Sequence, residues 1–374
     1  MRDKIWVWLF AFCSLATGSF SQLHDFKLKI HITGIDSADF EFILVGDHKK
    51  LSDNIVVNKL SNENYLVSGK LEYPSAANFF IKNRRGTKNF YLDFGEQSIN
   101  TSFDSLRYPL IVNGSKVNKE FIEKYTPFIA AFKKADTEWL ASYWAMEKKY
   151  NEDIPFKIKD SMLRIDKRNF QMRDSLIQRY ITHNPKSYIG FWALYDRFFI
   201  SGYTPSYDSS FLKLDKKIRK SVDGVKMKER LITSRQVTVG RKFPEMNLVD
   251  TFGIKKSLTP AFSGYTLIDF WYSNCSPCIA QFDKFKELHK TYFPKGFEII
   301  GISTDKKKNE MAWKKIIQKY EIPWIQLWDM DAELAQKFSI NSFPSNFLLD
   351  KEGKIIQIDI DPAQLEVYLN AHLK

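Results

Sequence analysis

The chain has 374 residues, a length at which proteins usually form two or three domains. Hydrophobic residues make up 44% of it and charged residues 27%, a composition that excludes a disordered chain. The net charge of +12 arises mainly in residues 113–235, which hold 25 basic and 15 acidic residues. These charges alternate along apparent helices, so they indicate a solvated surface, and we expect no nucleic-acid partner.

Residues 1–21 have the pattern of a signal peptide. Basic residues near the start precede an apolar stretch from Ile5 to Phe12, and small residues follow as far as Ser21, where cleavage is expected. The apolar stretch is shorter than the roughly 20 residues that span a bilayer. A retained membrane anchor and a lipid-modified Cys13 are the alternatives, and contact with a membrane is expected only if this segment, or the part of it that carries Cys13, is retained.

Residues 22–112 are predicted to form a small antiparallel β sandwich or barrel. Apolar residues take every second position over Phe26–Ile32, which is the period of a strand. Further strands, separated by glycine or proline in polar turns, are expected at Phe40–Val45, Ile55–Val57, Tyr65–Val67, Asn78–Lys82 and Asn89–Phe94. No catalytic cluster lies in this segment, so we interpret it as a binding or packing module.

Residues 113–235 are predicted to be helical, because from Asn118 the apolar residues recur at intervals of three and four. Separate helices are expected over Ile165–Tyr180 and from Asn184 to about Gly202, with one or two short ones over Phe211–Ile232. Aromatic side chains form stripes along these helices, and we interpret the stripes as core packing rather than the lining of a ligand pocket.

Residues 236–374 change to alternating strands and helices. Strands are expected at Phe243–Leu248, which would lie at a sheet edge, and at Thr266–Trp271, Phe297–Ser303, Phe347–Leu349 and Lys354–Ile358. Helices are expected at Cys275–Tyr292, Lys308–Tyr320, Ala332–Phe338 and Gln364–Leu373. This is the element order of a thioredoxin fold with additions, so the whole chain is predicted to be an α/β protein with a small β domain and a helical segment before that fold.

Cys275 and Cys278 lie three residues apart where a buried strand gives way to a helix. Once residues 1–21 are removed, they are the only cysteines left, so they can close into one disulfide. No histidine pair has the spacing of metal ligands, and a second cysteine pair is missing, so we expect no metal and no other cofactor. A pair of purely structural thiols is the alternative interpretation.

Four motifs together with this cysteine pair resemble the TlpA/ResA-type thiol–disulfide oxidoreductases, a thioredoxin-like family with an AhpC/TSA-type domain. The motifs are Val239–Pro244, Leu267–Trp271, Phe297–Asp305 and Phe343–Asp350. Residues 22–235 more loosely resemble the segments that precede this domain in envelope proteins of Bacteroidetes-type bacteria. Three positions depart from the family pattern: Asn274 replaces a tryptophan, Gln281 an acid and Asp283 a kinking proline.

The resemblance implies an enzyme of the periplasm or cell envelope that reduces protein disulfides and receives electrons from an upstream donor. Cys275 would be the exposed nucleophile and Cys278 the resolving thiol. Buried Asp269 would accept the proton of Cys278. A cis peptide bond between Phe343 and Pro344 would present backbone groups to an extended substrate.

Trp271 is expected to pack beneath this site and complete the substrate-binding region. Two other functions stay open. One is a thiol peroxidase, although the residues before Cys275 lack the proline and threonine that such enzymes use. The other is a binding or scaffolding module formed by residues 22–235, with a secondary redox domain.

Overall fold

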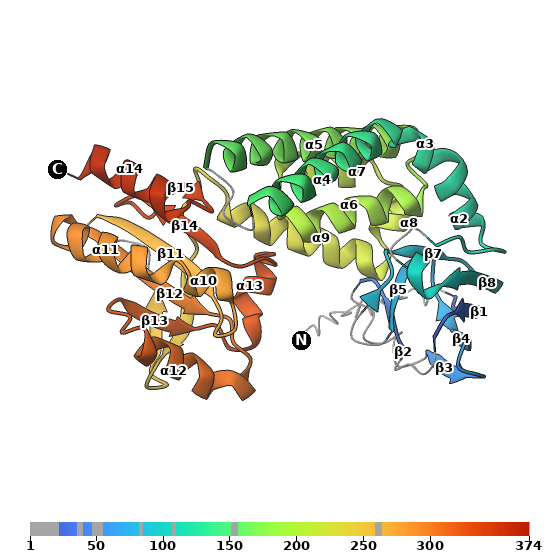
Figure 1. The fold of residues 1–374 in the computed structure, drawn as a ribbon, viewed down its shortest axis with the longest axis horizontal. Coiled ribbons are helices and arrows are strands. Elements are labelled where there is room, and N and C mark those ends of the chain that lie inside the picture. The colour runs from blue at the N-terminus through green and yellow to red at the C-terminus, as the bar shows by residue number, and fades with distance from the viewer. Residues whose placement is uncertain are drawn as a thin grey trace, which may run out of the picture. The chain divides into compact units, whose positions relative to one another are not determined.

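The computed structural model describes residues 22–35, 40–46, 55–81, 85–106, 110–150, 156–258 and 264–373. The predicted signal peptide therefore lies outside the described residues. The chain divides into two compact units, Met1–Asn118 and Lys119–Lys374 (Figure 1). Within the described part of the chain, every helix is too short or too polar to span a bilayer.

The first unit is a pair of four-stranded β sheets, with strand order β3-β4-β1-β8 in one and β2-β5-β6 in the other, where β7 also pairs with β5. The strands are β1 His24–Thr33, β2 Phe40–Leu44, β3 Val56–Lys59, β4 Asn64–Leu71, β5 Ser75–Ile81, β6 Arg85–Gly86, β7 Phe90–Leu92 and β8 Gly95–Ser102, followed by the 3₁₀ helix η1 Phe103–Ser105. Alternate residues of β1 are buried, as its period predicts. Strand β8 was not predicted, and it runs parallel to β1, whereas the other described pairs of this unit are antiparallel.

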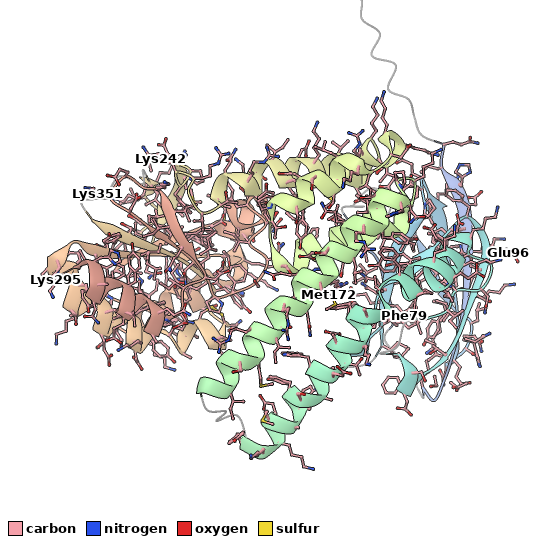
Figure 2. The ribbon with its side chains drawn as sticks, turned by 90° about the horizontal axis from the view of Figure 1, so that it is seen from above. Phe79, Glu96, Met172, Lys242, Lys295 and Lys351 are labelled. Atoms are coloured by element: carbon pink, nitrogen blue, oxygen red, sulfur yellow. A yellow bond between two sulfur atoms is a disulfide. The ribbon has the colours of Figure 1, made fainter. Side chains whose placement is uncertain are left out.

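Helices follow, as the sequence predicts. They are α2 Lys116–Glu120, the π-helical turn η2 Phe121–Tyr125, α3 Thr126–Phe128, α4 Ala130–Tyr150, α5 Phe156–His183, α6 Tyr188–Ser201, α7 Pro205–Lys213, α8 Lys216–Arg219, α9 Val222–Ser234 and the 3₁₀ turn η3 Arg235–Val237. Helix α5, marked by Met172 in Figure 2, packs along α4. Most aromatic residues of α6 are core residues: Phe191, Trp192 and Phe198 are buried, whereas Tyr188 and Phe199 are half-buried.

The last part of the chain forms a seven-stranded mixed sheet of order β10-β9-β13-β12-β11-β14-β15, with helices packed against it. Its strands are β9 Met246–Asp250, β10 Lys255–Leu258, β11 Tyr265–Trp271, β12 Phe297–Ser303, β13 Ile325–Trp328, β14 Ser345–Leu349 and β15 Ile355–Ile358. Its helices are α10 Ser276–Ile279, α11 Phe282–Tyr292, η4 Phe293–Lys295, η5 Lys307–Asn309, α12 Glu310–Lys319, η6 Met330–Ala332, α13 Glu333–Lys337 and α14 Pro362–His372. Strand β13 was not predicted. The predicted edge strand is also wrong, because β10 lies outside β9.

Strand β11 lies inside this sheet, between β12 and β14, and is buried on both faces. Leu267 and Trp271 pack with α11 on one face, and Ile268 and Phe270 pack on the other. Because side chains alternate along a strand, Asp269 points to the same face as Leu267 and Trp271. The chain leaves β11 directly into the loop that carries the two cysteines.

The predicted helix Cys275–Tyr292 is interrupted. Helix α10 ends in a tight turn, in which the backbone N–H of Gln281 donates to the carbonyl of Cys278 at 3.1 Å. Helix α11 then begins at Phe282. Position 283 is not a proline, so local backbone hydrogen bonds rather than a proline interrupt the helix. The helical periodicity of the sequence does not predict this break.

Candidate functional site

Cys275 and Cys278 form a disulfide with a Cα–Cα distance of 5.3 Å. Cys275 is the N-cap residue of α10, as expected for the first turn of the helix, and its Sγ accepts a hydrogen bond from the backbone N–H of Cys278 at 3.2 Å. That N–H would stabilise negative charge on Sγ once the disulfide opens. The expectation that Cys275 is exposed is wrong for this disulfide-bonded state: Cys275 is 2% exposed and Cys278 1%. Both sulfurs pack into the apolar cluster between β11 and α11.

A buried carboxylate holds the loop that precedes Cys275. Asp305 accepts hydrogen bonds from the backbone N–H of Ser273 at 2.8 Å and from its hydroxyl at 2.7 Å. The hydroxyl of Ser303 donates to the same carboxylate at 2.9 Å. Asp305 therefore fixes the path of the chain between β11 and the nucleophile. The sequence contained Asp305 within a family motif, but no local pattern connected it with Ser273.

Asp269 lies on β11 with 2% of its surface exposed. Its Oδ1 is buried and has no hydrogen-bond partner among the described residues. Burial raises the pKa of the Asp269 carboxyl to about 8, because removing the group from water disfavours its charged form. The side chain is thus a buried acid that can exchange a proton near neutral pH, on the sheet face against which the cysteines pack.

Trp271 packs beneath the site, as predicted, with its ring edge-on to Phe282 at 5.1 Å between centroids. Its indole Nε1 donates to Oε1 of Gln326 at 3.1 Å. Gln326 comes from β13, a strand that was not predicted, and it was not among the expected site residues. A buried indole N–H requires an acceptor, so Gln326 fixes the ring that supports the cysteine loop.

The Phe343–Pro344 peptide bond is cis, which confirms the expectation from the sequence. The ring of Phe343 meets that of Tyr272 edge-on, with centroids 5.5 Å apart. Tyr272 is 36% exposed, and Asn274 and Ser276 on either side of Cys275 are also exposed. The structure therefore brings the predicted Phe343 to the exposed loop before the cysteines.

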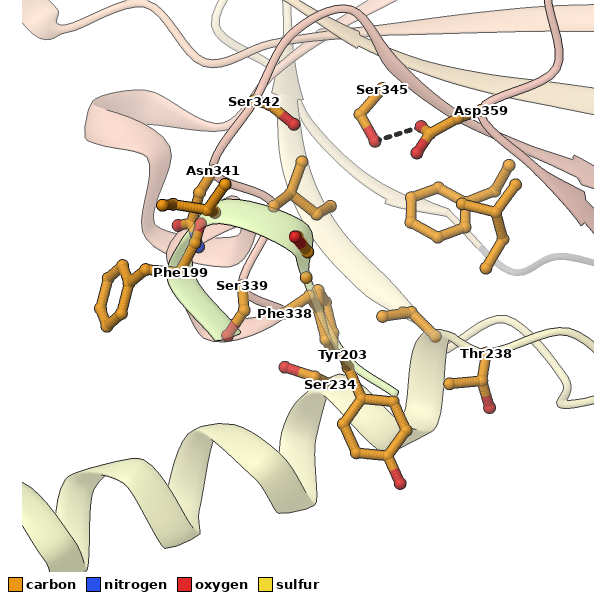
Figure 3. Close-up of a pocket in the computed structure, with 17 residues that line it drawn as sticks. Phe199, Tyr203, Ser234, Thr238, Phe338, Ser339, Asn341, Ser342, Ser345 and Asp359 are labelled. Atoms are coloured by element: carbon orange, nitrogen blue, oxygen red, sulfur yellow. Dashed lines mark hydrogen bonds between the residues drawn. The ribbon is translucent and has the colours of Figure 1, made fainter. Parts of the chain in front are cut away.

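The segment before Phe343 is attached to the helical part of its unit. The side-chain amide of Asn341 donates to the carbonyl of Phe199 at 3.2 Å, and the hydroxyl of Thr233 donates to the carbonyl of Lys337. A cavity of about 170 Å³ lies beside these contacts, at the ends of α6 and α9 (Figure 3). Ser345, just after the cis bond, lines it and donates to Asp359 at 2.7 Å. The helices thus hold one flank of the loop that carries Phe343 and Pro344.

Among the described residues, no three His, Cys, Asp or Glu side chains are grouped so that they could hold a metal ion.

A Cys-x-x-Cys disulfide at the start of a helix, directly after a buried inner strand of a mixed sheet, is the arrangement expected of a dithiol oxidoreductase. Residues 239–358 match the model of the AhpC/TSA family. The thiol-disulfide oxidoreductase ResA of Bacillus thuringiensis is 28% identical over 139 residues, which are 37% of this chain and 79% of that protein. ResA of Bacillus subtilis is 23% identical over 122 residues, covering 33% of this chain and 67% of that protein.

Among solved structures, a thiol-disulfide oxidoreductase from Bacteroides fragilis is 31% identical, covering 36% of this chain and 100% of that one, with a TM-score of 0.33. Each of these relatives covers between 33% and 37% of this chain. The family-model match and the ResA relatives make the chain a TlpA/ResA-like, thioredoxin-like protein of the thiol–disulfide oxidoreductase family.

Replacing Asp269 with asparagine should change how stability depends on pH. Between about pH 4 and pH 8, folded Asp269 keeps its proton while the unfolded chain releases it, so the wild type loses stability as the pH rises. Asparagine cannot ionise, so Asp269→Asn should lack this loss. We expect the variant to be more stable than the wild type by several kcal/mol at pH 9, and the two to differ little at pH 4.

Urea unfolding of the oxidised protein from pH 4 to pH 9 measures this difference. Asp283→Asn, at a side chain that is 83% exposed, removes the same charge and serves as the control. Parallel stability curves for Asp269→Asn and the wild type would contradict the assignment of Asp269 as a buried acid with a raised pKa.

Proposed function

We propose that the chain is a bacterial envelope enzyme that reduces disulfides in other proteins through the Cys275–Cys278 dithiol. The observation that carries this proposal is the Cys275–Cys278 disulfide at the first turn of α10, with an unpaired, buried carboxyl on the same face of β11. The match to thiol–disulfide oxidoreductases supports the class of reaction. The direction of electron flow, the protein partner and the location in the cell envelope belong to the proposal.

In the first step the thiolate of Cys275 attacks one sulfur of the partner disulfide. A bond forms between Cys275 and that sulfur, the partner's own S–S bond breaks, and the second partner sulfur leaves as a thiolate that takes a proton from water. The backbone N–H of Cys278 lies at the Cys275 sulfur and favours its ionised form. Cys275 is the attacking residue because it caps the helix, where this N–H is available.

In the second step Cys278 resolves the mixed disulfide. Its thiol proton passes to the carboxylate of Asp269, and the resulting thiolate attacks Sγ of Cys275. The Cys275–partner bond breaks, and the remaining partner sulfur leaves as a thiol after protonation. The partner has gained two electrons and the enzyme holds the Cys275–Cys278 disulfide. A dithiol donor upstream returns two electrons for the next cycle.

The partner segment is expected to lie across Tyr272 and the Phe343–Pro344 loop. An extended peptide can pair with the backbone of Phe343 while the rings of Phe343 and Tyr272 offer apolar contact beside the disulfide. Trp271 supports this region from below through its bond to Gln326. Because both enzyme sulfurs are buried in the oxidised state, they must become exposed before the upstream dithiol donor can attack the disulfide.

The proposed location rests on residues 1–21, which have the pattern of a signal peptide for export to the periplasm or cell envelope. Contact with a membrane follows only if that segment is retained. We propose that residues 22–112 and 113–235 are the modules that position the redox domain, residues 236–374, near its partners.

Replacing Cys275 with serine should abolish disulfide reduction. With insulin or another protein disulfide as substrate and a dithiol as donor, the rate should fall to that of the donor alone, because no nucleophile remains at the helix start. Cys278→Ser should instead accumulate a mixed disulfide through Cys275, visible by mass spectrometry. Ser276→Ala is the control, and wild-type turnover by Cys275→Ser would disprove the role of Cys275.

Replacing Asp269 with asparagine should slow resolution and leave the first attack by Cys275 largely intact. In the wild type the resolution rate should rise as the pH passes through about 8, because only the ionised carboxylate accepts the proton. Single-turnover experiments that follow formation and decay of the mixed disulfide separate the two steps. If the mixed disulfide decays in Asp269→Asn at the wild-type rate, Asp269 has no part in resolution. Asp283→Asn is the matched control.

The reduction potential of the Cys275–Cys278 couple tests the direction. A reductase should equilibrate near the potential of thioredoxin, about −270 mV, whereas a strong oxidant would lie near −120 mV, about the value of DsbA. Equilibration with defined thiol–disulfide buffers, followed by alkylation of free thiols, measures this value. A potential close to that of the oxidants would contradict the proposed direction and leave the dithiol chemistry in place.

A further inference from the structure

Three residues of neighbouring strands form one row across the sheet. Asp269 of β11 is in register with Gly301 of β12, and Gly301 is in register with Gln326 of β13. Side chains in one such row point to the same face, here the face of the cysteines. Asp269 and Gln326 are 2% and 6% exposed, so the row is closed to solvent.

Gly301 leaves room for the amide of Gln326 within this row. A Cβ atom at position 301 would lie 2.4 Å from Nε2 and 2.5 Å from Oε1 of Gln326. The amide of Gln326 therefore occupies the space that any side chain at position 301 would take. It extends over the middle strand toward Asp269.

The indole of Trp271 sets the orientation of this amide. Indole Nε1 can only donate, so it requires the oxygen of the amide, and Oε1 of Gln326 accepts its hydrogen bond at 3.1 Å. The nitrogen Nε2, with two donor hydrogens, then faces elsewhere and has no partner among the described residues. Oδ1 of Asp269 is a buried acceptor that also has no hydrogen-bond partner among the described residues.

The amide on the other side of Asp269 already has hydrogen-bond partners. Asn346 of β14 is in register with Asp269 on its far side. Its Nδ2 donates to the carbonyl of Ile360 at 3.0 Å, and its Oδ1 accepts from the N–H of Ile360 at 3.0 Å. Of the two amides that flank Asp269, only that of Gln326 therefore has its nitrogen unpaired.

We propose that Gln326 is a positioning residue for Asp269: Nε2 donates to the Asp269 carboxylate through one bridging water molecule, while Trp271 holds the amide in that orientation. Gln326 transfers no proton. It stabilises the ionised form of Asp269, the acid that takes the proton of Cys278 in the proposed mechanism. The effect of Gln326 on catalysis therefore rests on the proposed function, whereas its hydrogen bonding to Asp269 does not.

The other titratable groups near this face have separate roles. Cys275 and Cys278 are joined beside α10. From α11, Nε2 of His289 pairs with Glu298 at 2.9 Å, and Glu298 is in register with Thr266, a row that points to the face opposite Asp269. Asp305, beyond Trp271, accepts from the loop of Ser273. Of the two amides in the rows beside Asp269, Gln326 is thus the one with a free donor that can act on the Asp269 carboxylate.

The experiment measures the pKa of Asp269 directly, by titrating its ¹³C-labelled carboxyl in the oxidised protein by NMR. Gln326→Leu removes the donor, which should raise the pKa of Asp269 by about one unit. Gly301→Ala keeps Gln326 but forces its flexible amide out of the row, and should raise the pKa in the same direction. Gln336→Leu, at an exposed glutamine of α13, is the control that should change nothing.

An Asp269 pKa that is unchanged in both folded variants would overturn the proposal. Resolution kinetics supply the second readout: in Gln326→Leu the decay of the mixed disulfide should slow about tenfold at pH 7 and its pH profile should move upward, with its formation unchanged. In an Asp269→Asn background, Gln326→Leu should have no further effect on the decay of the mixed disulfide. If Gln326→Leu slows decay as much in that background as in the wild type, the proposal is also overturned.

These outcomes are distinguishable from failure of the proposed function. If the wild type forms no mixed disulfide but the pKa of Asp269 still rises in Gln326→Leu, the hydrogen bond stands and the reductase assignment falls. If the mixed disulfide forms and resolves normally while the pKa does not respond, the reductase assignment stands and the role of Gln326 falls.

Discussion

The site depends on one unfavourable arrangement, the burial of the Asp269 carboxyl in β11, an inner strand of the sheet. Ionised carboxylates are costly to bury without a partner, and an apolar residue at this position would avoid the cost. The pKa of the group is raised by burial, and no charged neighbour offsets it. A fold that retains such a group beside a reactive disulfide gains a proton acceptor that titrates near neutral pH, which is the property that resolution of a mixed disulfide requires.

Local sequence patterns predicted the parts of the site that are contiguous in the chain. The apolar run of β11 leads directly into Cys275 and Cys278, and the aromatic-proline pair Phe343–Pro344 has the expected cis bond. Gln326 and Asp305 could not be found in this way. Gln326 is 55 residues from Trp271, and Asp305 is 32 residues from Ser273, so these contacts exist only once the parallel strands are assembled.

The same limit explains the errors in the fold. Strand β8 lies beside β1 through a parallel pairing between segments about 70 residues apart, and its sequence is too polar to alternate clearly.

Charge was a poor guide to burial at one position. Arg197, within the basic segment expected to be solvated, is 1% exposed and donates to Asp174 at 2.6 Å. Paired burial of this kind depends on the packing of α5 against α6, which periodicity does not describe.

The departures from the family pattern acquire a physical meaning in this arrangement. Gln281 follows the cysteines where relatives often carry an acid, and its Oε1 is buried without a partner among the described residues. An amide there cannot take a proton from Cys278, so in the proposed mechanism proton transfer falls to the acid on β11. Asp269 is flanked by two amides, one of which is held by Ile360 and the other by Trp271. The pKa of Asp269 is raised by burial and, in our proposal, tuned by the neutral amide of Gln326, so its acidity should respond to packing rather than to salt.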